Sequence, residues 1–130
     1  RTLPGESGAE VQAHLDAALG DLADQVDVEI IMNDPASISR IDNPMWDTIQ
    51  KAVNQPFPSA RLVPQLIVGF TDARVYRNLG SIAYGAGLFS PDLKSSDFMS
   101  RFHGHNERID VESLSLTTQF WIDVCQDFLS

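Results

Sequence analysis

The sequence predicts a layered α/β protein, and three observations lead to this class. The chain has 130 residues, the size of one domain, and 43% of them are hydrophobic. The apolar residues recur at helical spacing in some stretches and alternate as in strands in others. The predicted order is strand, helix, strand, crossing segment, helix, strand, helix, strand, loop and helix. Such alternation favours helices that pack on a sheet.

The first predicted unit covers residues 1–32 and has the order strand, helix, strand. Residues 1–3 are interpreted as the end of a strand. Ser7 is a suitable helix N-cap, and Glu10, three positions later, completes a capping box. In residues 26–32 apolar side chains first alternate with acidic ones, which is typical of a half-buried strand with one wet face.

Residues 33–43 interrupt this pattern with Asn-Asp-Pro and Asp-Asn-Pro, and they are predicted to form a crossing linker between domains. Residues 44–130 then form the second predicted unit. Its first helix begins at Pro44, a residue that suits the first helical turn, and Asn43 is the expected cap.

Two short buried strands are predicted on either side of a short helix. Residues 61–68 are rich in aliphatic side chains, although Pro64 makes one strand an edge or a bend. Thr71 is the expected cap of the helix, and Gly80 is expected to end it. Residues 82–88 contain several small residues, which allow another backbone to approach closely.

The last segment is predicted to be a loop followed by a long helix. Residues 90–100 are polar, and we expect them to form a mobile loop. Asp110 is the expected cap of the final helix, with Glu112 favourably placed in its first turn. Apolar or small side chains expected to face a sheet follow at Leu114, Thr118, Trp121, Cys125 and Phe128.

Composition excludes some functions. The formal charge of −9 and the pI near 4.5 argue against a nucleic-acid partner, which selects clustered Lys and Arg. No apolar run approaches the roughly 20 residues that span a membrane, and no signal peptide is recognised. The single cysteine, Cys125, is expected to be a buried thiol. We therefore expect a cytoplasmic protein, although Arg1 in place of Met indicates an upstream part.

Most of the reactive side chains gather in residues 102–109, which read Phe-His-Gly-His-Asn-Glu-Arg-Ile. Imidazoles and carboxylates are zinc ligands, and alternate residues of an extended segment share one face. One hypothesis is therefore that His103, His105 and Glu107 bind a single ion. The other is a polar loop with surface histidines. A cupin-type site needs a further histidine downstream, and none follows His105.

Several motifs then appear in a fixed order. Residues 69–74 read Gly-Phe-Thr-Asp-Ala-Arg, and residues 77–80 read Arg-Asn-Leu-Gly. Residues 83–85 read Ala-Tyr-Gly, and residues 103–109 read His-Gly-His-Asn-Glu-Arg-Ile. With Arg-Thr-Leu-Pro-Gly at residues 1–5, this series resembles the C-terminal part of the dinuclear zinc hydrolases that include aminoacylase, acetylornithine deacetylase, succinyl-diaminopimelate desuccinylase and carboxypeptidase G. The resemblance covers nearly the whole chain.

The resemblance implies a fold for each part of the chain. Residues 1–32 would be the βαβ end of an inserted α+β lid, or dimerisation, domain. Residues 33–43 would be the crossing linker. Residues 44–130 would be the C-terminal portion of a zinc-exopeptidase-like, layered α/β catalytic domain.

The resemblance also implies roles for single residues. His103 matches a metal ligand, whereas His105 falls at a variable position and is not assigned as one. Residues that match substrate-binding positions are Arg1, Gly69 and Thr71. Residues expected to order the loops around the site are Asp72, Asn106 and Glu107, with Arg108 beside them. Phe70 departs from the usual pair of glycines in that loop.

The implied activity is zinc-dependent cleavage of the amide bond of an N-acyl amino acid or a short peptide. The full-length subunit would bind two zinc ions, or cobalt or manganese in their place, and would form a homodimer through the lid. The sequence has no Glu-Glu pair to supply the general base, and its His-x-Asp, at residues 14–16, lies within a predicted helix. The remaining ligands are therefore expected upstream, and the chain is expected to be inactive alone, as a fragment, a trimmed product or a degenerate relative.

Two alternatives belong to other functional classes. One is a dimerisation module with no catalytic role. The other is a self-contained metal-binding domain that uses His103, His105 and Glu107.

Overall fold

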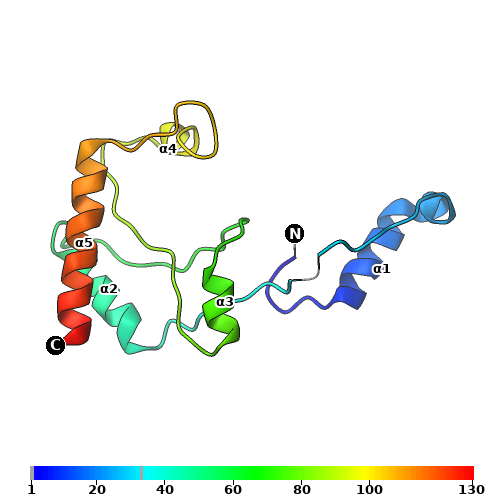
Figure 1. Cartoon of the computed structure of the whole chain (residues 1–130), viewed down its shortest axis with the longest axis horizontal. Helices are drawn as coiled ribbons and strands as arrows, with labels where there is room; N and C mark the ends of the chain where they lie inside the picture. The colour runs from blue at the N-terminus through cyan, green and yellow to red at the C-terminus, as the bar shows by residue number, and fades with distance from the viewer. Residues whose placement is uncertain (1, 33) are drawn as a thin grey trace. The chain divides into compact units, whose positions relative to one another are not determined.

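The computed structural model describes residues 2–32 and 34–130, and its contacts divide the chain into two compact units. The first unit runs up to Ser39 and resumes from Leu66 to Ala83. The second consists of Arg40–Gln65 and Tyr84–Ser130. Figure 1 shows the helices of both units. The expected domain boundaries, at residues 32 and 44, stay a prediction.

Helix α1 (Gly8–Leu19) opens the first unit, and a 3-10 helix, η1 (Gly20–Gln25), follows it. The predicted capping box is confirmed. The Glu10 amide donates to Ser7 Oγ at 3.3 Å, and the Ser7 amide donates to Glu10 Oε2 at 2.7 Å. Gly20 has φ of 53°, a left-handed conformation that glycine adopts readily, and α1 ends there.

Helix α3 (Ala73–Asn78) has a well-formed end and a weak beginning. The prediction that Thr71 caps it is wrong, because Asp72 occupies the cap position and makes no side-chain capping bond. The prediction for Gly80 is confirmed. At φ of 87°, its amide donates to the Arg77 carbonyl at 2.9 Å, and the next amide, of Ser81, reaches the Tyr76 carbonyl at 2.9 Å. This pair of bonds is a Schellman motif.

Arg77 ties two distant segments of the first unit together. Its Nη2 donates to the Ala83 carbonyl at 2.6 Å, and its Nε lies 3.0 Å from Ser39 Oγ. The Ser39 hydroxyl also accepts the Ala83 amide at 3.0 Å. Because Ser39 is buried, these bonds satisfy polar groups that would otherwise be costly to enclose.

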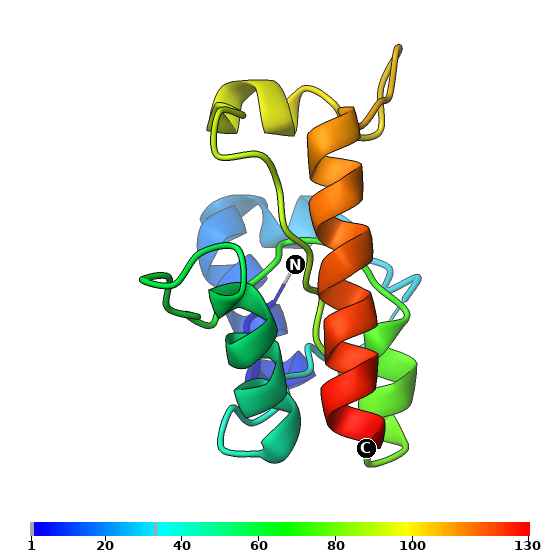
Figure 2. The same ribbon diagram turned by 90° about the vertical axis from the view of Figure 1, so that its left-hand side faces the viewer.

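Two helices, α2 (Pro44–Asn54) and α5 (Val111–Leu129), pack against each other and form the core of the second unit. Figures 1 and 2 both show them side by side. Both predicted caps are confirmed: Asn43 Oδ1 accepts the Trp46 amide at 3.2 Å, and Asp110 Oδ1 accepts the Ser113 amide at 2.8 Å. The buried apolar side chains are Ile49, Ala52, Val53, Phe120 and Val124.

A polar contact joins the same two helices near the end of α5. Asp127 Oδ2 accepts from the buried Thr48 hydroxyl at 2.7 Å and lies 3.0 Å from Lys51 Nζ. The Thr48 hydrogen bond, and then that of Lys51, lower the pKa of Asp127 below its usual value. The contact fixes the register of α2 against α5, because both partners come from defined helical positions.

The segment from Tyr84 to Ser90 runs along α5 and covers the core from the side. Its backbone bonds to hydroxyl groups of the helix: the Leu88 amide donates to Thr117 Oγ1 at 3.0 Å, and the Ser90 amide donates to Ser113 Oγ at 2.9 Å. A Cβ at Gly87 would lie 3.4 Å from Thr117 Oγ1. Gly87 therefore lies close to a side chain of α5, and the expectation that another backbone approaches these small residues stays a prediction.

The predicted sheet is not formed: residues 26–32, 61–68 and 82–88 contain no strand in the described part of the chain. A strand needs the N–H and C=O groups of a neighbouring strand, and no such neighbour lies among the described residues. Apolar side chains of the first two segments are consequently exposed, with Ile31 at 89% and Val68 at 78%. The layered α/β arrangement is not confirmed by this chain.

Three predictions about the last segment are corrected. Residues 90–100 contain a short helix, α4 (Ser95–Met99), and are not simply a loop. The buried face of α5 carries Ser113, Phe120 and Val124, one position before the predicted stripe, and it packs on α2 and not on a sheet. Cys125 is exposed for the same reason. A shift of one residue turns the inward face by about 100°.

The corrected face of α5 leads to a mutational prediction. Phe120 is 2% exposed, so Phe120→Ala is expected to lower the free energy of unfolding by about 3–5 kcal/mol. Phe128→Ala, at a side chain that is 44% exposed, is expected to cost about 1 kcal/mol. Urea unfolding followed by circular dichroism measures both variants. An equal loss in the two would contradict the assigned face.

Candidate functional site

The candidate site is the loop that joins α4 to α5, residues 100–110, and His103 lies near its middle. The His103 backbone has φ of 53°, and that of Asn106 has φ of 61°. Positive φ is uncommon for residues other than glycine, and asparagine and histidine are among the residues that adopt it most readily.

The His103 imidazole is exposed and free to bind a ligand from outside the loop. It forms no hydrogen bond with the residues that the structure describes. Its nearest aromatic neighbour is the adjacent Phe102, with ring centroids 6.4 Å apart. The position of the imidazole therefore depends on how the backbone of the loop is held.

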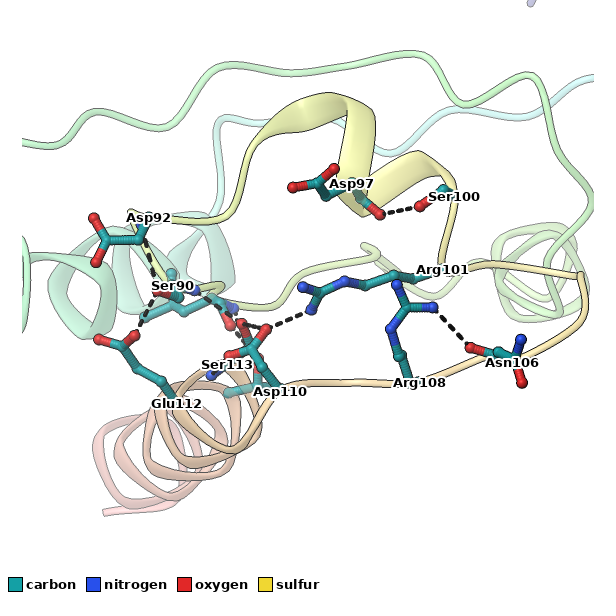
Figure 3. Close-up of polar contacts among 12 residues, drawn as sticks. Ser90, Asp92, Asp97, Ser100, Arg101, Asn106, Arg108, Asp110, Glu112 and Ser113 are labelled. Carbon is teal, nitrogen blue, oxygen red and sulfur yellow. Dashed lines mark hydrogen bonds and ion pairs between the residues drawn. The ribbon is translucent and has the colours of Figure 1, made fainter.

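A polar cluster holds the loop at its neck, as Figure 3 shows. Arg101 Nη1 lies 2.7 Å from Asp110 Oδ2. The same carboxylate accepts the Ser113 amide and the Ser113 hydroxyl, each at 2.8 Å. Ser113 is fully buried and also accepts the Ser90 amide, while the Ser90 hydroxyl donates to Glu112. The loop neck, the start of α5 and the segment before α4 thus share one network.

Aromatic side chains support the same loop from α4. Phe98 meets Phe89 and Phe102 edge to face, and both pairs of ring centroids are 4.6 Å apart. Such pairs contribute about 0.5–1.5 kcal/mol beyond the area they bury. Phe102 directly precedes His103, so its contact with Phe98 restrains the loop on the N-terminal side of the histidine, whereas Asp110 restrains the loop on the C-terminal side.

The remaining predicted residues of the loop have few contacts. Asn106 and Glu107 are exposed, and the Asn106 carbonyl accepts from Arg108 Nη1 at 3.0 Å (Figure 3). His105 is exposed as well. Whether Asn106 and Glu107 order the site stays a prediction.

Gly69, Thr71 and Asp72 lie together in the first compact unit, just before α3, and all three are exposed. The departure from the glycine pair has a local explanation. The Phe70 ring lies 4.0 Å under the Arg74 guanidinium, which also forms an ion pair with Asp34. Phe70 therefore packs with a charged side chain of its own motif. Arg1, the predicted carboxylate-binding residue, lies outside the described residues.

The described residues do not assemble a metal site by themselves. No group of three or more His, Cys, Asp or Glu side chains in residues 2–32 and 34–130 is placed to hold an ion. In particular, the three side chains of the self-contained alternative, His103, His105 and Glu107, do not form such a group. A zinc site needs three or more protein ligands, so His103 fits only as one member of a larger set.

Sequence reasoning missed Arg101 and Ser113, which place the loop. Arg101 and Asp110 pair across a loop of nine positions, and no periodic pattern indicates such a contact. The signal for α4 was weak but present: Asp97 lies in its first turn, where a carboxylate is favourable. Ser113 resembled an ordinary surface serine because its role depends on the segment that covers it.

Comparison with known proteins gives a single family. The model of "Peptidase family M20/M25/M40" matches residues 3–127. No solved structure shows a significant match to the chain.

Among the described residues, no helix combines the length and the apolar character that a membrane crossing requires.

Three curated relatives match nearly the whole chain. It is 31% identical over 120 residues to the N-fatty-acyl-amino acid synthase/hydrolase PM20D1 of Xenopus tropicalis, which covers 90% of the chain. It is 26% identical over 123 residues to a probable carboxypeptidase S-like 2 of Dictyostelium discoideum, and 30% identical over 125 residues to PM20D1.1 of Danio rerio, with 93% covered in each. The chain spans only 23–24% of the length of these relatives.

The polar cluster predicts an acid-dependent loss of stability. The Ser113 amide and hydroxyl, and then Arg101, hold the pKa of Asp110 at about 2, below its usual 3.8. A lowered folded-state pKa stabilises the fold above the unfolded-state value, and this contribution disappears as pH falls through the folded-state value.

The stability advantage of the native chain over Asp110→Asn is therefore expected to be full above pH 4 and to fade between about pH 4 and pH 2. Thermal unfolding of both proteins across this range measures it. Asparagine is the matched change because it still caps a helix. A difference that stays constant over this interval would contradict the assigned role of Asp110.

Proposed function

Because the chain belongs to peptidase family M20/M25/M40, we propose that it is the C-terminal part of a metal-dependent hydrolase that cleaves amide bonds. The observation that carries the proposal is the family match over residues 3–127, which includes the exposed histidine in its left-handed turn. M20 proteins are generally metal-dependent, usually with zinc. We propose zinc here, two ions per full-length subunit.

The proposed substrates are N-acyl amino acids and short peptides with a free carboxylate. The names of two relatives support this substrate class. The relatives bear the names of an N-fatty-acyl-amino acid synthase/hydrolase and of a carboxypeptidase S-like protein. Arg1 is the proposed partner of the substrate carboxylate, with Gly69 and Thr71 as further contacts and Asp72 ordering that loop.

His103 is the proposed metal ligand of this chain, with Asn106 and Glu107 supporting its loop. When bound, zinc would lower the pKa of a water molecule and make it a good nucleophile. The described residues offer no complete ligand set, so we assign no reaction step to them. The other ligands and the general base are proposed to lie in the part of the polypeptide that the chain does not span.

The extended apolar segments support the same proposal. Val63, Ile67 and Val68 are each more than half exposed, and so are Ile30 and Ile31. Pairing with strands from the rest of the enzyme would cover these side chains and satisfy their backbone groups. Residues 26–32, 61–68 and 82–88 are proposed to become strands there, with residues 1–32 in a lid domain and residues 44–130 in the catalytic domain.

A homodimer through the lid domain, residues 1–32, which contains α1 and η1, is the proposed assembly. Neither helix buries a single residue, and Leu22 of η1 is 55% exposed. The exposed apolar side chains of Leu15, Leu22 and Val26 would be covered in such an interface. Sedimentation equilibrium of the full-length enzyme should give twice the subunit mass, and a monomer at all concentrations would exclude the dimer.

The ligand assignment is tested by substitution in the full-length enzyme. His103→Ala is expected to lose bound zinc and to lower kcat/KM by a factor of about 1,000 or more, because a metal ligand holds the ion that activates water. His105→Ala is the matched control, since it removes an exposed imidazole two residues away, and it should retain both. Elemental analysis and hydrolysis of an N-acyl amino acid provide the readouts. Normal zinc content in His103→Ala would contradict the assignment.

A further inference from the structure

The neck of the histidine loop is closed by one ion pair that is partly shielded from solvent. Arg101 Nη1 and Asp110 Oδ2 are 2.7 Å apart, and their side chains are 19% and 32% exposed. Figure 3 shows Arg101 extended across the neck toward this carboxylate. Charge-assisted hydrogen bonds with little solvent around them are stronger than those on an open surface. The two residues bracket the whole turn that contains His103.

Asp110 is a rigid anchor for this pair. Its carboxylate is already fixed by the Ser113 amide and hydroxyl in the first turn of α5. Because α5 belongs to the packed core of the second unit, Arg101 is tied to that core. The ion pair thereby transfers the position of the helix to the loop.

Arg101 depends on this partner. Its Nε is buried and has no hydrogen-bond partner in the described part of the chain. A buried donor without a partner destabilises a structure, so the side chain holds its place through the bond to Asp110 and the packing of its stem. The neighbouring Arg108 differs, since it is exposed and reaches only the carbonyl of Asn106.

His103 needs such support because its own side chain has none. One residue, Phe102, separates it from Arg101 in the sequence, its backbone φ is positive, and its imidazole makes no hydrogen bond with described residues. A loop with an open neck would sample many conformations, and closing it removes this freedom before a ligand binds.

We propose that Arg101 is a positioning residue for His103: its ion pair with Asp110 closes the loop neck and presents the imidazole to the metal in a fixed place. The inference rests on the proposed function, since it takes His103 as a metal ligand. It goes further by assigning a role to a residue outside the histidine motif. A metal ligand held in this way binds tightly because little ordering is left to occur on binding.

The test compares Arg101→Ala, Arg101→Lys and Arg61→Ala in the full-length enzyme. Arg61 is the matched control, because it is an exposed arginine of the same unit that lies outside the loop. Zinc affinity is measured by competition with a chelator, and the mobility of residues 102–109 is measured by amide hydrogen exchange. The cap of α5 stays in place in all three variants, because Asp110 and Ser113 are unchanged.

Arg101→Ala is expected to weaken zinc binding about 10–100-fold, the range for residues that orient a metal ligand. Exchange in residues 102–109 should become about tenfold faster, which corresponds to the loss of one charge-assisted bond, while the Ser113 amide is unaffected. Arg101→Lys should recover part of both effects, and Arg61→Ala should match the native enzyme.

Unchanged zinc affinity in Arg101→Ala, with zinc still lost in His103→Ala, would overturn the inference and leave the proposed function intact. Zinc retained in His103→Ala would overturn the proposed function itself. If Arg101→Ala fails to fold, Arg101→Lys decides. Native zinc affinity together with faster amide exchange in residues 102–109 overturns the positioning role. Weaker zinc binding together with faster exchange supports it.

Discussion

The second compact unit depends on the apolar contact between α2 and α5. Phe120 and Val124 of α5 meet Ile49, Ala52 and Val53 of α2, and these are the buried apolar side chains of the described residues. Everything at the site is attached to this contact through α5. Asp110 begins the helix, Ser113 binds the segment before α4, and Arg101 closes the loop against the same carboxylate. A rigid helix therefore supports a loop that has almost no core of its own.

The features that the sequence predicted correctly are local ones. The capping box of Ser7 and Glu10, the caps Asn43 and Asp110, and the helix end at Gly80 each depend on residues no more than five positions apart. At that range the chain has few alternatives, and hydrogen-bonding chemistry decides between them. Thr71 is the exception, because Asp72 has helical backbone angles and takes the cap position.

The features that could not be predicted depend on distant partners. Strands in residues 26–32 and 61–68 need neighbours to pair with, and the described residues supply none. The inward face of α5 was set by α2 and not by a sheet, so Phe120 is buried while Trp121 and Cys125 are not. The motif points to His103 as the candidate residue, whereas the ion pair of Arg101 with Asp110 beside it could not be predicted, because an ion pair across a loop leaves no periodic trace.

The candidate site therefore combines a well-supported loop with one proposed metal ligand, His103. The His103 side chain is exposed, and the chain belongs to peptidase family M20/M25/M40, whose model matches residues 3–127. The relatives are about four times as long as the chain, which leaves room for the missing ligands.

The most direct test of this account is the zinc content of the 130-residue chain, purified at neutral pH without chelator and analysed beside its His103→Ala form. The account predicts no stoichiometric zinc in either protein, because one imidazole cannot hold the ion alone. One tightly bound zinc per chain that is lost in His103→Ala would contradict it, since the chain would then carry a complete metal site.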